Sequence, residues 1–174
     1  MEFEDRLRFI FANTNDLLKF AEAKNGALVV FTAGSLVGLC DKFKDIAVDN
    51  FFFPAIVLMV FLLLSLISAL WSFMPRSQEV KLRWRLRKVP VDQNIIYAGH
   101  LADLTGEQLC RRLDIRNNRY SKDRFIKHLA DQIVLNAGIA ALKFEIFSIA
   151  LFLSVAGILL SAGFFIAVFI HANT

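Results

Sequence analysis

Two long stretches of the sequence, residues 50–75 and 146–174, contain no Asp, Glu, Lys or Arg. Each exceeds the roughly 20 apolar residues that cross ~30 Å of bilayer hydrocarbon as an α-helix. They hold much of the hydrophobic content, which reaches 56% of the chain, whereas soluble domains contain about 45–50%. The pattern excludes an ordinary soluble domain, and the remaining residues are too few for a large enzyme core.

A third apolar segment, residues 26–40, is also uncharged but slightly short for a span. With Ala21 and Ala23 added, it predicts a transmembrane helix, and a re-entrant or interfacial segment is the alternative. An amphipathic helix precedes it, because apolar residues recur there at steps of four and three. The seam of that helix consists of Phe3, Leu7, Ile10, Thr14, Leu17 and Ala21.

The net charge of +4 is distributed unevenly. Residues 75–144 hold fourteen Lys and Arg against seven Asp and Glu, and six of the positive residues fall within 76–88. Lys and Arg close to a span favour the cytoplasmic side of the membrane. We therefore expect a cytoplasmic N-terminus, a short external turn at 41–50, a cytoplasmic segment at 75–144 and an external Thr174. No cleavable signal peptide is recognisable, so we expect the apolar runs to be retained.

The basic segment is expected to be largely helical. Residues 80–89 (VKLRWRLRKV) alternate between basic and apolar positions, which favours one short strand. Residues 94–113 are predicted as two helical pieces, the second introduced by the capping-box spacing of Thr105 and Gln108. From about residue 122 to 170 a single helix is expected. Its stripe consists of Phe125, Leu129, Ile133, Asn136, Ala140, Phe144 and Phe147.

These segments predict a mainly α fold, an oligomeric three-span membrane protein with a basic, largely helical cytoplasmic layer. Its parts are an amphipathic cytoplasmic helix (1–24), a two-span hairpin (25–74), a basic domain and stalk (75–144) and a third transmembrane helix (145–174). Small residues four apart allow close helix packing, within the chain or between subunits. They are Gly34, Gly38, Ala150, Ser154, Gly157 and Ser161.

Two basic clusters in the cytoplasmic layer have two interpretations, a surface for anionic lipid or a binding site for a phosphorylated ligand. The positive residues are Arg83, Arg85, Arg87, Lys88, Arg111, Arg112, Arg116 and Arg119. Trp84 and Tyr120 are available for base stacking. The sequence contains no Walker A or GxGxxG motif.

Catalytic signatures are also missing from the sequence, which has no nucleophile elbow and no paired-carboxylate site. His100 with Asp103 and His128 with Asp131 form two similar pairs, which we interpret as surface or capping residues. We expect no metal, no cofactor and no enzyme activity. The hypotheses that remain are a ligand-gated membrane effector and a holin-like or scaffolding protein without a ligand, followed by a small membrane enzyme.

Four segments together resemble a known family. They are FAEAKNGALVVFTAGSLVGL at 20–39, the uncharged 51–75 ending in Met-Pro-Arg, NIIYAGHLADLTGEQLCRRL at 94–113, and HLADQIVLNAGIAALKFEIFSIALFL at 128–153. In segment order and short motifs they are similar to the small transmembrane effectors of the Pycsar type from bacterial anti-phage operons. The resemblance covers most of the chain from about Phe20.

The resemblance implies an inner-membrane effector that forms an oligomeric pore or channel and impairs the membrane to stop phage propagation. It also implies control by the product of a partner cyclase or other nucleotidyltransferase. No cyclic-nucleotide-binding β-roll is recognisable in the sequence. This absence argues against a cyclic mononucleotide sensor. The expected ligand is a nucleotide second messenger or a single-stranded oligonucleotide, and the oligonucleotide would suit the abundant positive charge. Whether the ligand opens the channel or holds it closed stays open at this point.

Overall fold

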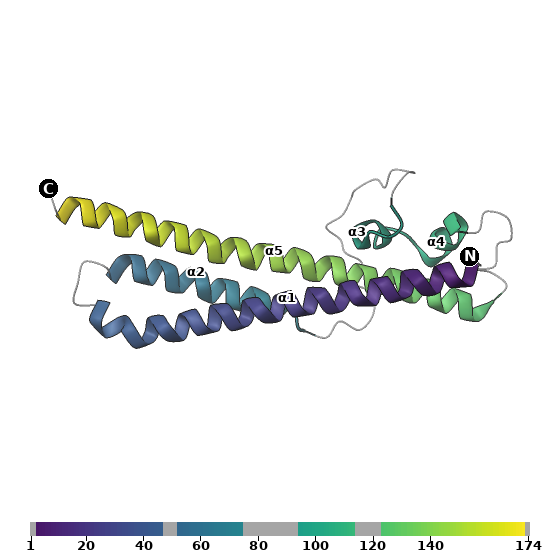
Figure 1. The fold of residues 1–174 in the computed structure, drawn as a ribbon, viewed down its shortest axis with the longest axis horizontal. Helices are drawn as coiled ribbons and strands as arrows, with labels where there is room; N and C mark the ends of the chain where they lie inside the picture. Colours follow the sequence, from purple (N-terminus) through teal and green to yellow (C-terminus); the bar gives the residue numbers. More distant parts are fainter. Residues whose placement is uncertain (1–2, 47–51, 75–93, 114–122, 173–174) are drawn as a thin grey trace. The chain divides into compact units, whose positions relative to one another are not determined.

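The computed structural model describes residues 3–46, 52–74, 94–113 and 123–172. Its helices are α1 (Phe3–Ile46), α2 (Phe52–Trp71), α3 (Ala98–Leu101), α4 (Gly106–Leu113) and α5 (Arg124–Ala172), as Figure 1 shows. Within these ranges 91% of the residues are helical and none forms a strand. The strand predicted at 80–89 lies outside the described residues. Because α1, α2 and α5 are long and apolar enough to cross a membrane, the mainly α, three-span prediction is confirmed.

Contacts between residues divide the chain into two compact units. The first comprises Met1–Glu22 and Pro75–Phe144, and the second comprises Ala23–Met74 and Glu145–Thr174. Both α1 and α5 therefore begin in the first unit and end in the second.

The first 22 residues of α1 contribute a narrow buried seam, as the amphipathic pattern predicts. Leu7, Ile10, Thr14 and Ala21 are buried, and the Thr14 hydroxyl donates a hydrogen bond to the Ile10 carbonyl at 2.7 Å. At its other end α1 continues to Ile46, so the external turn predicted at 41–50 is wrong up to that residue. The physical reason is that residues 41–46 contain no Gly or Pro, and nothing there interrupts the helix.

The core of the first unit lies where α3 and α4 pack against α1 and the first part of α5. The two short helices confirm the prediction for 94–113. Thr105 and Gln108 form the expected capping box: the Thr105 N–H donates to Gln108 Oε1 at 2.9 Å, and the Gln108 N–H donates to Thr105 Oγ1 at 3.2 Å. The buried residues of this core are Leu7, Ile10, Ala98, Leu101, Leu104, Leu109, Cys110, Ile126, Ala130, Ile133 and Ala137.

Helix α5 begins one residue after Asp123, whose carboxylate accepts a hydrogen bond from the Phe125 N–H at 2.8 Å. Its 49 residues form one helix of about 73 Å, which confirms the unbroken helix expected from 122 to 170. The predicted stripe is partly wrong, because Phe125 is 55% exposed and the neighbouring Ile126 is buried. Small residues such as Ala130 and Ala137 form the packing face, since they allow the other helices to approach closely.

In the second unit, α2 runs antiparallel to the adjoining parts of α1 and α5 (Figure 1). Leu28, Ala69 and Ala150, one residue from each helix, form a small buried cluster at one end of the spans. Near the same end, the Lys24 ammonium lies 5.4 Å from the centre of the Phe147 ring. This is a favourable cation–π distance.

Candidate functional site

Helix α4 forms one side of an open pocket of about 330 Å³ in the first unit. The pocket is lined by Asp103, Leu104, Gln108, Arg111 and Arg112. Leu104 is buried in the core and anchors the segment before α4. The capping box holds Gln108 Oε1 on the backbone, so the Gln108 amide nitrogen remains as a donor at the pocket.

The two arginines of this pocket have different electrostatic surroundings. Arg111 forms an ion pair at 2.5 Å with Glu107, one helical turn earlier; the Arg111 side chain is largely exposed and the Glu107 side chain is half-exposed. Arg112 is half-buried, and within the described parts of the chain it has no acidic partner. Because the charge of Arg111 is already matched, Arg112 is the group best placed to bind an anion.

Asp103 gives the pocket a second kind of chemistry. Its carboxylate accepts hydrogen bonds, whereas the Arg112 guanidinium and the Gln108 amide nitrogen donate them. A guanidinium suits a phosphate group, and a carboxylate suits a ribose hydroxyl or the amino group of a base. The pocket therefore carries complementary groups for both parts of a nucleotide.

Helix α4 also packs very closely on α5. A Cβ atom added at Gly106 would lie 2.9 Å from the backbone nitrogen of Asp131 and 3.1 Å from the carbonyl carbon of Ala130. Only glycine allows this approach, so the first residue of α4 rests directly on the α5 backbone. Any displacement of α4 must act on α5 at this contact.

Most of the predicted ligand site lies outside the described residues. Arg111 and Arg112 lie on α4, but the other members of the two basic clusters lie outside the described residues. These are Arg83, Trp84, Arg85, Arg87, Lys88, Arg116, Arg119 and Tyr120. Of the two His–Asp pairs, His128 is exposed and His100 packs edge-on against Tyr97. No group of three His, Cys, Asp or Glu side chains gathers anywhere in the described ranges.

In the second unit, the small residues of α5 lie against α2. A Cβ atom added at Gly157 would come within 2.5 Å of the Phe61 Cβ, and Ala150 and Ser154 are fully buried. The Ser161 hydroxyl donates to the Pro54 carbonyl at 3.0 Å. Since the chain itself supplies α2, these four α5 positions pack within one subunit.

Hydrogen bonds between serines connect the same two helices. The Ser65 hydroxyl donates to the Ala150 carbonyl at 2.7 Å, and the Ser154 hydroxyl donates to Ser65 Oγ at 2.8 Å. All three residues are fully buried. Neither Ser65 nor Phe61 was predicted from the sequence. Ser65 could have been noticed, because a hydroxyl in an uncharged apolar run usually has a partner.

Gly34 and Gly38 behave differently from the small residues of α5. No atom lies within 4 Å of a Cβ added at either glycine. On the same stretch of α1, Val30 and Val37 are 74% and 71% exposed. This face of α1 is therefore not covered by the described residues of its own chain.

A comparison with family models gives one match, to a model described as the Pycsar effector protein domain. It covers residues 6–170 and thus includes all of the helices described above except a few terminal residues. No curated protein and no solved structure matches the chain.

Proposed function

The chain belongs to the Pycsar effector family, membrane proteins of anti-phage cyclic nucleotide signalling, and from this premise we propose that it forms an oligomeric channel in the bacterial inner membrane that a cyclic nucleotide opens. The nucleotide is the product of a partner cyclase. We propose that the nucleotide binds beside α4 and that the N-terminus lies in the cytoplasm. The observation that carries this proposal is the pocket with an unmatched Arg112 on a helix resting directly on α5.

An oligomer is required because three helices are too few to enclose a water path. The α5 face of Ala150, Ser154, Gly157 and Ser161 is occupied by α2 and is not available to a second subunit. The uncovered α1 face with Gly34 and Gly38 remains, and small residues there would let a second copy approach closely. We assign the contact between subunits to this face.

Whether the nucleotide opens or closes the channel follows from what such an effector does in the cell. A channel that stayed open without a signal would damage the cell that carries it. We therefore propose that the channel is closed without the nucleotide and opens when the nucleotide binds. Opening requires that the nucleotide bind the open state more tightly than the closed state.

Helix α5 provides the connection between pocket and channel. It contacts Gly106 of α4 at Ala130 and Asp131, and the same helix continues to Ala172 past Gly157 and Ser161. A ligand held by Arg112 and Asp103 shifts α4, and the close backbone contact passes this shift to α5. Because α5 has no described break, a rotation at one end reaches the other.

Binding to the full-length chain in detergent tests the pocket, with the four 3′,5′-cyclic mononucleotides as probes. Arg112→Ala should weaken binding of the preferred probe about 10- to 150-fold, the equivalent of a charged hydrogen bond of about 1.5–3 kcal/mol. Lys19→Ala is the matched control, because it removes one positive charge from α1 in the same unit at an exposed ion pair with Asp16. Equal affinities for the two variants would show that the pocket is not the sensor.

If no cyclic mononucleotide binds the unmodified chain, the proposed cyclic mononucleotide ligand is wrong. An oligonucleotide ligand, or the holin-like or scaffolding alternative without a ligand, would then remain.

A further inference from the structure

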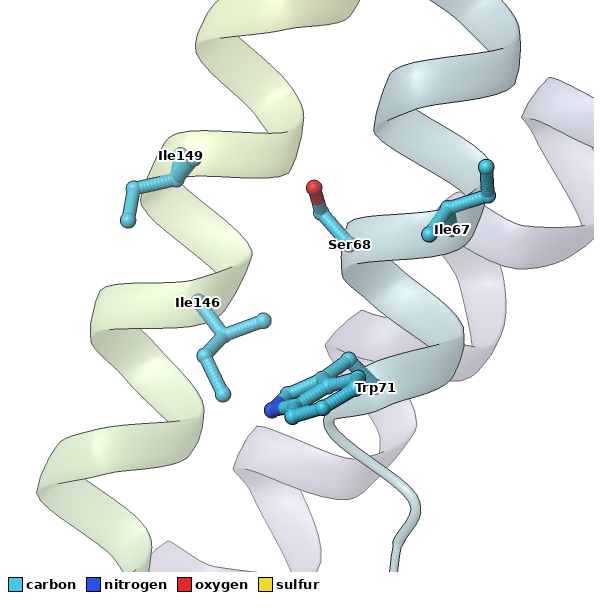
Figure 2. Close-up of a pocket in the computed structure, with 5 residues that line it drawn as sticks. All are labelled: Ile67, Ser68, Trp71, Ile146 and Ile149. Carbon is cyan, nitrogen blue, oxygen red and sulfur yellow. The ribbon is translucent and has the colours of Figure 1, made fainter.

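A groove on the second unit opens between α2 and α5, close to the end of α2 (Figure 2). It is lined by Ile67, Ser68 and Trp71 of α2 and by Ile146 and Ile149 of α5, and its volume is about 310 Å³. Beyond it, from Ala150 onward, small α5 residues bring the two helices into close contact. The groove exists because α5 presents isoleucines in place of small residues at 146 and 149.

The groove is almost entirely apolar, with a single available donor. The Ser68 hydroxyl already donates to the Leu64 carbonyl of its own helix at 2.8 Å. The Trp71 side chain is 58% exposed, and its indole N–H has no acceptor among the described residues. In Figure 2 the indole nitrogen lies on the side of the ring that faces α5. An occupant should therefore be an apolar chain with a hydrogen-bond acceptor at one end.

Positive charge close to this end of the spans narrows the choice of occupant for the groove. Lys24 lies over the ring of Phe147, the neighbour of Ile146 in α5. In the sequence, α2 is followed within seventeen residues by the six Lys and Arg of 76–88. Cations at a span end attract anionic lipids, and tryptophan at this depth donates to lipid oxygen atoms.

We propose that the groove binds an anionic phospholipid. One acyl chain lies along Ile67, Ile146 and Ile149, and the indole N–H of Trp71 donates to an ester or phosphate oxygen of the same lipid. This site is separate from the nucleotide pocket, and it does not depend on the function proposed above.

Trp71 itself reports on the occupant. The full chain carrying Trp84→Phe has Trp71 as its single tryptophan, and it can be placed in phosphatidylcholine vesicles with 20% phosphatidylglycerol. Bromine atoms on the acyl chains of one lipid class at a time quench a tryptophan that touches that class. We expect Trp71 to be quenched at about fivefold lower mole fraction by brominated phosphatidylglycerol than by brominated phosphatidylcholine. The attraction between the one negative charge of phosphatidylglycerol and a nearby Lys or Arg accounts for a preference of that size.

Leu70 supplies the matched control, because it is on the same turn of α2, is 50% exposed and does not line the groove. Leu70→Trp in a Trp71→Phe, Trp84→Phe chain should be quenched equally by the two lipids. Ser68→Leu, which narrows the groove, should reduce the preference seen at Trp71. The proposal is wrong if both tryptophans show the same preference, or if Trp71 shows none. It is also wrong if Trp71 is shielded from both lipids while Leu70→Trp is quenched, because protein then fills the groove.

Discussion

Replacing Gly157 by alanine should separate α2 from α5. The new Cβ would lie 2.5 Å from the Phe61 Cβ and 3.2 Å from the Phe61 Cγ, well inside ordinary van der Waals contact. Because the Phe61 Cβ is bonded to the backbone, no rotation of the ring relieves the overlap, and the helices must move apart by nearly 1 Å. Overpacking of this kind costs about 1–3 kcal/mol.

The same movement should weaken the serine contacts one and two turns away. A hydrogen bond of 2.7 Å between Ser65 and the Ala150 carbonyl would approach 3.7 Å and be lost. Such bonds contribute about 0.6 kcal/mol on average in membrane proteins, with a maximum near 1.7. We therefore expect Gly157→Ala to reduce the free energy of unfolding by about 1–3 kcal/mol or slightly more.

Gly163→Ala is the control, since Gly163 is in the same helix and a Cβ there meets nothing within 4 Å. Both substitutions change helix propensity equally, so the difference between them isolates the contact with Phe61. Unfolding in mixed detergent micelles, followed by circular dichroism, measures this difference. Equal stabilities of the two variants would refute the close packing of α2 on α5.

Three further predictions follow from other contacts. Ser65→Ala should lower the free energy of unfolding by about 0.6–1.7 kcal/mol in the same assay, because it removes the hydrogen bond to α5. Ser68→Ala should leave the free energy of unfolding nearly unchanged, because the Ser68 hydroxyl bonds only within α2. Equal losses in the two variants would count against the serine network. Gly34→Leu should not lower the free energy of unfolding of the single chain, because its surroundings are open and leucine favours a helix more than glycine does. It should shift the mass in mild detergent toward one chain, and an unchanged oligomer would exclude this face as the subunit contact. Reporter fusions should place position 95 and the N-terminus on the cytoplasmic side and position 174 outside. If position 95 and the N-terminus lie on opposite sides, residues 26–40 do not cross the membrane.

The helices of this fold follow from the sequence to a large extent, because each strong local pattern agrees with the packing that results. The seam of Leu7, Ile10 and Thr14, the capping box of Thr105 and Gln108, and the unbroken α5 were all predictable. The end of α1 was not, since a change from apolar to charged residues at 41 indicates where a membrane ends and does not stop a helix. Phe125 was predicted in the stripe of α5 because it keeps the helical spacing of Leu129 and Ile133, whereas the close contact with α4 requires small residues such as Ala130.

The candidate site was less accessible to sequence reasoning. Counting positive residues gives Arg111 and Arg112 equal weight, although Glu107, four residues before Arg111 on the same helix, forms an ion pair with Arg111. From the sequence, Asp103 is recognisable only as part of a His–Asp pair, although it lines the pocket with Arg112. Similarly, the pattern of Gly34 and Gly157 is the same in sequence, but one residue faces open space and the other meets Phe61. Helix neighbours such as Phe61 come from distant parts of the chain, which a local pattern does not contain.

Ion flux from sealed vesicles that contain the purified full-length chain tests the central claim most directly. Vesicles loaded with a fluorescent ion indicator should stay closed until a 3′,5′-cyclic mononucleotide is added, and the preferred one of the four should then release the ions. Arg112→Ala should shift the required nucleotide concentration upward about 10- to 150-fold, in parallel with its effect on binding, while Lys19→Ala responds like the unmodified chain. Vesicles that remain closed with every cyclic mononucleotide, or that leak equally without any, would contradict a nucleotide-opened channel.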